Sequence, residues 1–307
     1  MSNCKPIVPE ALAGQTLCLT GFSGYVGKHL VSTLVDAGVR PFLIGRPGHT
    51  LEPMAGADVA VRWDSSQELA TQLAQLVNPV VLNIAGHFVS RHSSSDIPPL
   101  VAGNLEFPIK IFEAVALSRT TRIVNVGTSW EYSDQGSPEP ANLYAQLKAS
   151  NAAALEWYAR QFEFQALNVK LNDTYGGNDT RAKLMPLLHA CATDGQPAAL
   201  NAWAQRLNLL HIVDVQEGLL AAVIHTASIT PGTVQTAFLL GDETVTVGAL
   251  MERIQAGPAP LLSFSFKDTR LENPELRDVW AAAPQLPNWR PRISLEVGLD
   301  DYFGSIK

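Results

Sequence analysis

The sequence predicts an α/β protein built on a doubly wound parallel sheet, with a smaller lobe towards the C-terminus. Strand-like and helix-like runs alternate over the first 176 residues, as they do where helices connect parallel strands. The strand-like runs are continuously apolar, which is typical of strands buried on both faces. A glycine-rich loop joins the first strand to the first helix. The 307 residues suffice for one large α/β unit with an added lobe.

The expected elements follow from these runs in chain order. Short apolar runs predict strands at 15–20, 41–44, 58–63, 80–86, 122–129 and within 166–177. Helical spacing of apolar residues predicts helices at 28–37, 67–76, 100–118 and 142–162. Gly38 follows the first helix, at a position where glycine commonly ends one.

The loop TGFSGYVG carries Gly21, Gly24 and Gly27 directly after a strand and before a helix. Gly21 permits a tight turn, Gly24 lets the backbone approach a pyrophosphate, and Gly27 lets the helix lie close to the strand. The helix N-terminus offers free N–H groups and a positive dipole end to the anion. This context predicts a dinucleotide-binding Rossmann fold, the alternative being a glycine-rich turn without a ligand. The expected cofactor contacts in the loop are Gly21, Phe22, Ser23, Gly24, Tyr25, Val26 and Gly27.

The end of the second strand bears on the choice between NAD and NADP. NAD sites usually carry a carboxylate there, which binds the ribose 2′-hydroxyl. Here the strand ends in Ile44, Gly45 and Arg46. Arg46 is therefore expected to pair with a 2′-phosphate, which favours NADP(H) over NAD(H), unless it is a solvated surface arginine. Asp64 is expected to accept from the adenine amine or to cap a helix, and Ala85 to contact the cofactor.

Composition excludes several other classes of function. The formal net charge is −7 and no basic cluster is present, so a nucleic-acid partner is not expected. Cys4, Cys18 and Cys191 lie far apart, which argues against disulfides and a metal site and favours a reducing cytoplasm. The N-terminus does not resemble a signal peptide, and no apolar run reaches about 18 residues, so no membrane association is expected.

Tyr144 and Lys148 are four residues apart on an expected helix, so they project from one face. A neighbouring ammonium favours tyrosinate and lowers the pKa of the phenol, which suits it to exchange a proton near neutral pH. An ordinary surface pair is the alternative. However, the pair comes just after the strand that ends in Thr128 and Ser129. A hydroxyl there can polarise a carbonyl while Tyr144 protonates it and a nicotinamide cofactor donates hydride.

Taken together, these motifs resemble the extended short-chain dehydrogenase/reductase family over residues 14–245. The resemblance rests on TGFSGYVG, VVLNIAG, VNVGTSWEYSD, YAQLK and LNDTYGGNDTRAKL. It implies a nucleotide-sugar substrate and a homodimer, because the helix with the YxxxK motif commonly forms the dimer interface in this family. By register with Tyr132, the resemblance assigns the catalytic hydroxyl to Thr128, with Ser129 as its substitute. It also implies that Lys148 holds the nicotinamide ribose.

Within the family, GTSWEYSD and DTYGGNDTRAKLMPLL are most similar to NADPH-dependent 4-ketoreductases of nucleotide-linked 4-keto-6-deoxysugars, CDP-abequose synthase-like enzymes among them. The family's 4,6-dehydratases have Asp–Glu directly after the catalytic threonine, whereas Ser129 and Trp130 stand here. The catalytic region also lacks the cysteine of the epimerising GDP-fucose synthases. A 4-epimerase that recycles bound NAD, a reductase of a small aromatic or terpenoid ketone, and a dinucleotide-sensing protein remain alternatives.

The expected substrate contacts are His87, Ser129, Trp130, Asp173, Arg181, Lys183 and Arg206. Many relatives bind a phosphate through an arginine at the register of Leu207 and have Asn at the register of Asp173. The phosphates are therefore expected to rely on the adjacent Arg206, or on Arg181 and Lys183 near a helix N-terminus, unless these two are ordinary surface charges. His87 contacts the sugar or only packs in its loop. Trp203 and Trp289 are expected to pack in the core rather than stack on a base.

The chain is expected to divide into two units. Beyond residue 176 the alternating pattern loosens, and 252–292 is rich in proline. We expect residues 1–175 and 211–244 to form the dinucleotide-binding domain. The substrate-binding lobe is then expected to comprise 176–210 and 245–307.

Overall fold

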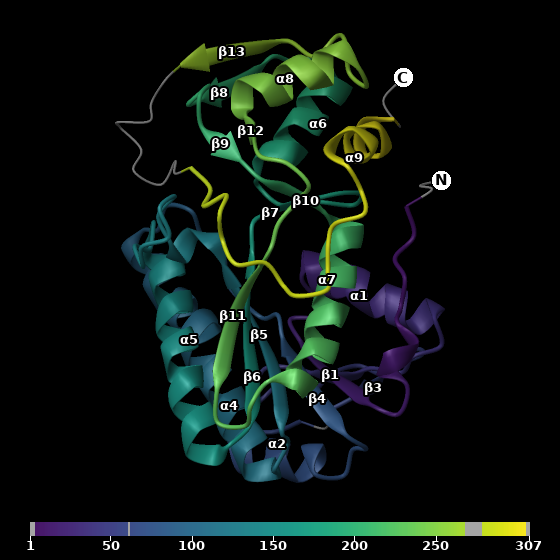
Figure 1. Ribbon diagram of the computed structural model, residues 1–307, viewed down its shortest axis with the longest axis vertical. Helices are drawn as coiled ribbons and strands as arrows, with labels where there is room; N and C mark the ends of the chain where they lie inside the picture. The colour runs from purple at the N-terminus through teal and green to yellow at the C-terminus, as the bar shows by residue number, and fades with distance from the viewer. Residues whose placement is uncertain (1–3, 61, 268–277, 305–307) are drawn as a thin grey trace.

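The computed structural model describes residues 4–60, 62–267 and 278–304. Its centre is a seven-stranded parallel sheet in the order β11-β6-β5-β4-β1-β2-β3 (Figure 1). The strands are β1 (Thr16–Thr20), β2 (Phe42–Ile44), β3 (Asp58–Val59), β4 (Pro79–Asn83), β5 (Arg122–Thr128), β6 (Gln165–Leu171) and β11 (Val234–Leu239). The predicted doubly wound Rossmann fold is thereby confirmed.

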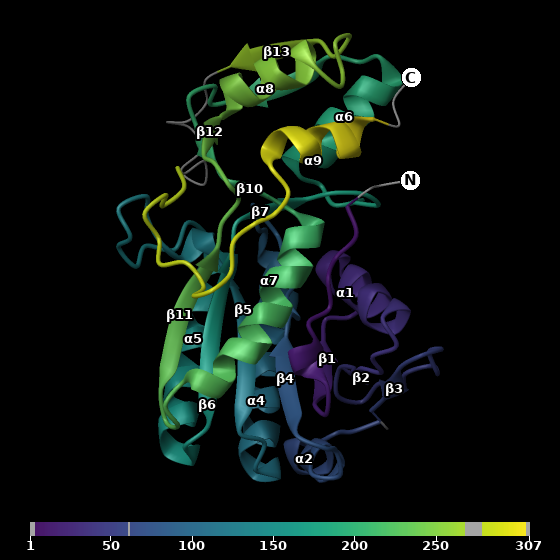
Figure 2. The ribbon, with the colours of Figure 1, turned by 45° about the vertical axis from the view of Figure 1, so that its right-hand side comes forward.

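Helices cover both faces of this sheet. On one face lie α1 (Tyr25–Asp36) and α7 (Ile212–His225), and on the other lie α2 (Ser66–Leu73), α4 (Phe107–Ser118) and α5 (Leu143–Phe162) (Figures 1 and 2). Each face has its own apolar core, for example Leu30 with Leu219 on the first and Ile111 with Leu155 on the second. This double covering explains why the strands read as continuously apolar.

The strand order reverses beside β1, whose two neighbours are β2 and β4. In open α/β sheets, ligands bind beyond the carboxyl ends of the strands at such a reversal, because the connecting loops diverge to opposite faces. The glycine loop follows β1 at this edge, and the loop that begins at Ile84 follows β4. The topology therefore locates the candidate site before any side chain is considered.

A second group of elements lies beyond the carboxyl edge of the sheet, at the top of Figure 1. Its helices are α6 (Leu184–Asp194), α8 (Val247–Ala256) and α9 (Leu295–Phe303). Its strand pairs are β7 (Asp173–Tyr175) with β10 (Leu209–His211), β8 (Ala198–Asn201) with β13 (Phe264–Lys267), and β9 (Arg206–Leu207) with β12 (Val245–Thr246). These elements share a separate apolar core, which supports the proposed substrate lobe.

One segment of the expected lobe contacts the sheet instead. Phe238 of β11 donates its N–H to Pro284 O at 2.7 Å, and Leu286 donates its N–H to Phe238 O at 3.3 Å. Leu286 and Trp289 are buried in the core between the sheet and α7. We therefore propose the two-unit division with residues 283–289 assigned to the dinucleotide-binding side.

Two local features differ from the sequence-based prediction. The third strand ends at Val59 rather than residue 63, because Trp63 turns into the core and donates from Nε1 to Gly45 O at 3.2 Å; residue 61 lies outside the described residues. The helix expected at 100–118 is divided into α3 (Ile97–Val101), a π-helical turn (Ala102–Glu106) and α4. Such turns often accompany functional sites, because they redirect a side chain from the regular ladder.

Within the described parts of the chain, no helix combines the length and apolarity that a membrane crossing requires. The same residues contain no cluster of three or more His, Cys, Asp or Glu that could hold a metal ion. Trp203 stacks on Phe264, with ring centroids 5.3 Å apart, and Trp289 is buried. Both tryptophans therefore pack against the protein, as expected.

Candidate functional site

The glycine loop leaves no room for side chains at two of its glycines. Gly21 has a φ of 68°, and a Cβ there would lie 2.6 Å from Ala85 N. A Cβ on Gly27 would lie 2.6 Å from the Cα of Phe22 and would also overlap Gly21 O. The loop thus holds the N-terminus of α1 close to the ends of β1 and β4, with Gly24 as the N-cap. This cradle of exposed N–H groups fits a dinucleotide pyrophosphate.

The adenosine end of the expected cofactor site lies beyond β2. Arg46 is exposed just after this strand, and the Asp64 carboxylate lies near Gly48 of the same loop. Ser65, not Asp64, caps α2, because its hydroxyl accepts from Glu68 N at 3.3 Å. The Asp64 carboxylate therefore does not cap the helix, and its expected contact with adenine stays a prediction.

Lys148 reaches from α5 to the carboxyl ends of two strands of the sheet. Its Nζ donates to Ala85 O at 2.9 Å and to Val126 O at 3.0 Å, and the side chain is buried. Burial lowers the pKa of Lys148 to about 8; the Glu131 carboxylate opposes this lowering of the pKa, and the Lys170 ammonium adds to it. The carbonyl bonds fix Nζ beside the switch point, and its expected contact with the nicotinamide ribose stays a prediction.

Tyr144 lies one turn before Lys148 on the first turn of α5, where Asn142 caps the helix by accepting from Ala145 N at 2.9 Å. Its ring meets Phe88 edge to face, with centroids 5.1 Å apart. Burial raises the pKa of Tyr144 above its ordinary value, the Glu131 carboxylate raises it further, and the Arg181 guanidinium opposes both effects. The prediction that Lys148 lowers this pKa is wrong, because burial dominates and Lys148 Nζ is bound by two backbone carbonyls.

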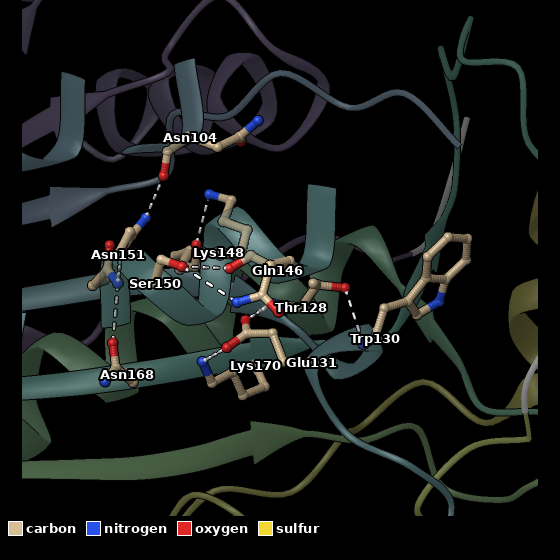
Figure 3. Close-up of polar contacts among 12 residues, drawn as sticks. Asn104, Thr128, Trp130, Glu131, Gln146, Lys148, Ser150, Asn151, Asn168 and Lys170 are labelled. Atoms are coloured by element: carbon tan, nitrogen blue, oxygen red, sulfur yellow. Dashed lines mark hydrogen bonds and ion pairs between the residues drawn. The ribbon is translucent and has the colours of Figure 1, made fainter. Parts of the chain in front are cut away.

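Thr128 ends β5 on the same edge of the sheet, as its motif predicted. Its hydroxyl accepts from Trp130 N at 3.3 Å, and Glu131 accepts from Thr128 N at 2.8 Å (Figure 3). These reciprocal bonds form a capping box around the 3-10 turn Ser129–Glu131. The turn presents Ser129 to a small hollow of about 30 Å³.

A row of buried polar side chains, one threonine and three asparagines, crosses the sheet below the candidate site. Thr20, Asn83, Asn125 and Asn168 occupy matching positions on β1, β4, β5 and β6. Hydrogen bonds of 2.6 to 3.0 Å link each to the next, and Asn125 also donates to Asn151 of α5 at 2.8 Å. Because Asn151 lies one turn after Lys148, the row fixes α5 against the sheet and thereby the position of the lysine.

The row continues from Asn151 to the loop after β4. Asn151 donates to Asn104 O at 3.1 Å (Figure 3). Asn104 in turn donates to His87 O at 2.8 Å and accepts from His87 N at 3.1 Å. The π-helical turn supplies this Asn104. Asn104 thereby anchors the backbone that precedes Phe88, the residue that contacts Tyr144.

Replacing Asn125 by alanine is expected to lower the free energy of unfolding by about 2 kcal/mol, because three buried amide atoms lose their partner. A water molecule that enters the space would restore part of the loss. Urea unfolding of both proteins measures the change. The exposed Asn201 on β8 is the control, and its replacement by alanine should leave stability unchanged. Equal effects of the two substitutions would contradict the role assigned to the row.

A cavity of about 270 Å³ opens between the sheet and the proposed lobe, next to the Phe88 that contacts Tyr144. Its residues come from the loop after β4, from the 3-10 turn and from β7 to α8, and include Phe88, Trp130, Asp173, Lys183, Leu200 and Gln205. Phe88 and Trp130 meet edge to face, with centroids 5.8 Å apart. Lys183 Nζ lies 3.0 Å from Asp173 Oδ1 and 5.0 Å from the Phe88 ring. Three of the expected substrate contacts, Trp130, Asp173 and Lys183, are therefore brought together.

The other expected cations lie elsewhere. Arg181 pairs with the Asp179 carboxylate through two bonds of 2.7 Å, donates to Thr174 O at 2.8 Å and stacks on the Tyr25 ring at 4.0 Å. The guanidinium is thus bound by local partners next to Tyr25 and does not line the 270 Å³ cavity, and its expected contact with the substrate stays a prediction. Arg206 is exposed and lines only the small hollow.

His87 also lies away from the cavity. Its side chain is exposed and its backbone is bound to Asn104, whereas the next residue, Phe88, lines the cavity and contacts Tyr144. Sequence reasoning missed Phe88, although it is the one aromatic ring other than histidine in the mostly polar loop 87–99. It also missed Glu131, for which the Thr-x-x-Glu spacing of a capping box was a visible signal.

Comparison with known proteins places these features in a family. A model described as the NAD dependent epimerase/dehydratase family matches residues 17–237. The CDP-abequose synthase of Yersinia pseudotuberculosis is 27% identical over 208 residues, 67% of this chain and 72% of that protein. That of Salmonella typhimurium is 22% identical over 181 residues, 58% of this chain and 59% of that protein.

Solved structures with the same fold include two complexes with nucleotide sugars. MoeE5 in complex with UDP-glucuronic acid and NAD has a TM-score of 0.76 at 18% identity, over 94% of this chain and 98% of that chain. The UDP-glucuronic acid 4-epimerase of Bacillus cereus, in complex with UDP-glucuronic acid and NAD, has a TM-score of 0.76 at 17% identity, over 95% and 98%. Because the family model spans more than half of the chain, this protein belongs to the NAD-dependent epimerase/dehydratase family of extended short-chain dehydrogenase/reductases and is an NAD(P)-dependent enzyme.

Proposed function

We propose that this enzyme reduces the C4 ketone of a nucleotide-linked 4-keto-6-deoxysugar, with NADPH as the reductant. The observation that carries the proposal is the arrangement of Tyr144 and Lys148 on one face of α5. Lys148 is bound to the ends of β4 and β5, the second of which ends in Thr128, and Tyr144 contacts Phe88, which lines a largely apolar cavity. When bound, the cofactor supplies the hydride for the carbonyl carbon. The similarity to two proteins named CDP-abequose synthase supports a CDP-linked sugar as the first substrate to test.

Each residue has a distinct role in this proposal. The Tyr144 phenol, kept protonated by its raised pKa, gives its proton to the developing alkoxide at C4. The Thr128 hydroxyl donates a hydrogen bond to the same oxygen. The Lys148 ammonium holds the nicotinamide ribose. The Lys183 ammonium binds the diphosphate of the substrate and gives up part of its contact with Asp173 when it does so.

The position of Glu131 argues against dehydration. Glu131 is the acidic residue nearest after Thr128, but its carboxylate is buried and bound to Lys170 and Thr128 N. It lines neither cavity. A carboxylate held in this way is not available to remove the proton from C5 of a sugar.

The apolar faces of Phe88 and Trp130 favour a 6-deoxysugar. Both rings line the cavity and contact each other, and Phe88 also contacts Tyr144. A C6 methyl group is bound better by aromatic carbon than a hydroxymethyl or carboxylate group. This feature separates the proposal from the second candidate, a 4-epimerase that recycles bound NAD, which the complexes of the structural neighbours suggest.

Incubation with CDP-4-keto-6-deoxyglucose and NADPH tests the proposal. The expected result is stoichiometric loss of absorbance at the NADPH band and a 4-hydroxy product by NMR. Interconversion of C4 epimers of a CDP- or UDP-linked hexose, without net NADPH oxidation, would establish the epimerase instead. Turnover of only small apolar ketones would refute both nucleotide-sugar functions.

Replacing Arg46 by aspartate tests the proposed preference for NADPH. Loss of a charge-assisted bond to the 2′-phosphate should raise the KM for NADPH by about 10- to 100-fold, whereas the KM for NADH should hold or fall because a carboxylate can accept from the 2′-hydroxyl. Steady-state kinetics with both cofactors measure this. The exposed Arg40, paired with Asp58 at 2.8 Å, is the control when replaced by glutamine. Equal changes for the two cofactors would contradict the role of Arg46.

A further inference from the structure

A buried ion pair lies directly behind the proposed acid–base groups. Glu131, at the end of the 3-10 turn, contacts the ammonium of Lys170 on β6 (Figure 3). Their side chains are 3% and 1% exposed. Removing two charges from water is costly, and apolar residues of similar size often replace such a pair without loss of stability. Stability alone is therefore a weak explanation for the pair.

The first function of Glu131 is geometric. Its Oε1 accepts from Thr128 N at 2.8 Å, while the Thr128 hydroxyl caps the turn that carries Ser129 and Trp130. The fit is close, because a Cβ on Gly127 would lie 2.8 Å from Lys170 Nζ. Lys170 holds the other carboxylate oxygen, so the carboxylate is fixed at both ends. Movement of Glu131 would therefore move the Thr128 hydroxyl.

The second function is electrostatic. The titratable groups that interact with this pair or with Tyr144 come from three parts of the chain. They are Tyr132 after the 3-10 turn, Tyr144 and Lys148 on α5, and Arg181 before α6. Glu131 raises the pKa of both Tyr144 and Lys148, whereas Lys170 lowers the pKa of Lys148. The two members of the pair thus shift the pKa of Lys148 in opposite directions.

We propose that the Glu131–Lys170 pair is a positioning device for catalysis, which holds the Thr128 hydroxyl and sets the local charge around Tyr144 and Lys148. The proposal rests on the acid–base roles proposed above. It extends them to two residues that do not line the substrate cavity. Neither residue is a catalytic residue itself, because each acts through its neighbours.

Three variants separate geometry from charge. Glu131→Gln retains an oxygen that can accept from Thr128 N but removes the negative charge. Lys170→Met removes the positive charge at similar length. The double variant Glu131→Gln/Lys170→Met leaves neither an unpaired buried charge nor a net change of charge, so it provides a folded reference if a single variant is unstable.

The pH profile of kcat/KM gives readouts of opposite sign. Reduction requires protonated Lys148, so activity of the wild type should fall as the pH rises through about 8. Glu131→Gln removes an attraction for the Lys148 ammonium and so lowers the pKa of Lys148. The alkaline limb of the profile, where activity falls, should therefore move to lower pH by roughly one unit. Lys170→Met removes the repulsion between the two ammonium groups and so raises the pKa of Lys148, and the alkaline limb should move to higher pH. The double variant should lie between the single variants.

Glu131→Ala tests the geometric function, because it removes the acceptor for Thr128 N together with the charge. It should lower kcat at least 10-fold more than Glu131→Gln, with little change in the KM for NADPH. Equal losses in these two variants would overturn the geometric function. If Glu131→Ala does not fold, Glu131→Asp takes its place in the comparison with Glu131→Gln. Its shorter side chain cannot reach Thr128 N in the same way, so its kcat should be lower than that of Glu131→Gln.

The exposed pair Glu106–Lys110, at 2.6 Å on α4 and the turn before it, is the matched control. Glu106→Gln and Lys110→Met should leave the profile unchanged. Shifts of the same sign in Glu131→Gln and Lys170→Met, or no shifts, would overturn the electrostatic function.

Titration of the Lys148 side chain by NMR, assigned with Lys148→Met, measures the same shifts without a substrate. If the ketosugar is not reduced by the wild type, the proposed function fails. The NMR shifts then still decide whether the pair controls Lys148.

Discussion

Replacing Tyr144 by phenylalanine should lower kcat for ketone reduction by about 10²- to 10⁴-fold, the usual contribution of a positioned acid. The phenol is the proton donor in the proposed reaction, and its raised pKa keeps it protonated across the working pH range. Phenylalanine retains the ring that meets Phe88 edge to face, so the fold and the affinity for NADPH should hold. Single-turnover oxidation of bound NADPH measures the chemical step.

Tyr158→Phe is the matched control for this experiment. Tyr158 lies on the same helix, but its hydroxyl donates to Glu113 Oε2 at 2.9 Å on the side of α4, away from the cavity. Its loss should leave kcat unchanged. Retention of full activity by Tyr144→Phe, or an equal loss in both variants, would refute the proposed proton donor.

The motifs that could be recognised from the sequence are those in which the backbone alone sets the geometry. The glycine loop needs only a strand, three glycines and a helix, and Tyr144 and Lys148 need only helical spacing. The continuous apolar runs predicted the covered parallel sheet for a similarly local reason. The order of the strands then brings these local motifs to one edge of the sheet.

Contacts between distant side chains could not be predicted in this way. Arg181 was expected at the substrate. The structure shows its guanidinium bound to Asp179, two residues earlier, and its contact with a substrate stays a prediction. Glu131 and Lys170 are 39 residues apart and meet only because β5 and β6 are neighbours. Helical spacing predicted that Lys148 would affect Tyr144, but not the burial that dominates the pKa of Tyr144.

Replacing Gly27 by alanine adds one methyl group to the cofactor site and should lower both the stability of the fold and the affinity for NADPH. The new Cβ would lie 2.6 Å from Phe22 Cα and would overlap Gly21 O, and backbone atoms cannot turn aside as a flexible side chain can. The N-terminus of α1 must therefore move away from the loop, which costs about 3 kcal/mol of unfolding free energy. The same movement displaces the N–H groups that would bind the pyrophosphate.

The expected consequence for Gly27→Ala is a dissociation constant for NADPH raised at least 10-fold, which corresponds to about 1.4 kcal/mol. Fluorescence titration with NADPH and urea unfolding measure the two effects separately. Gly177→Ala is the control, because nothing lies within 4 Å of a Cβ at that position and its φ is not in the left-handed region. If Gly27→Ala bound NADPH as tightly as Gly177→Ala, the close approach of α1 to the loop would not be what prepares the site for the cofactor. The need for glycine at position 27 would then be a requirement of folding alone.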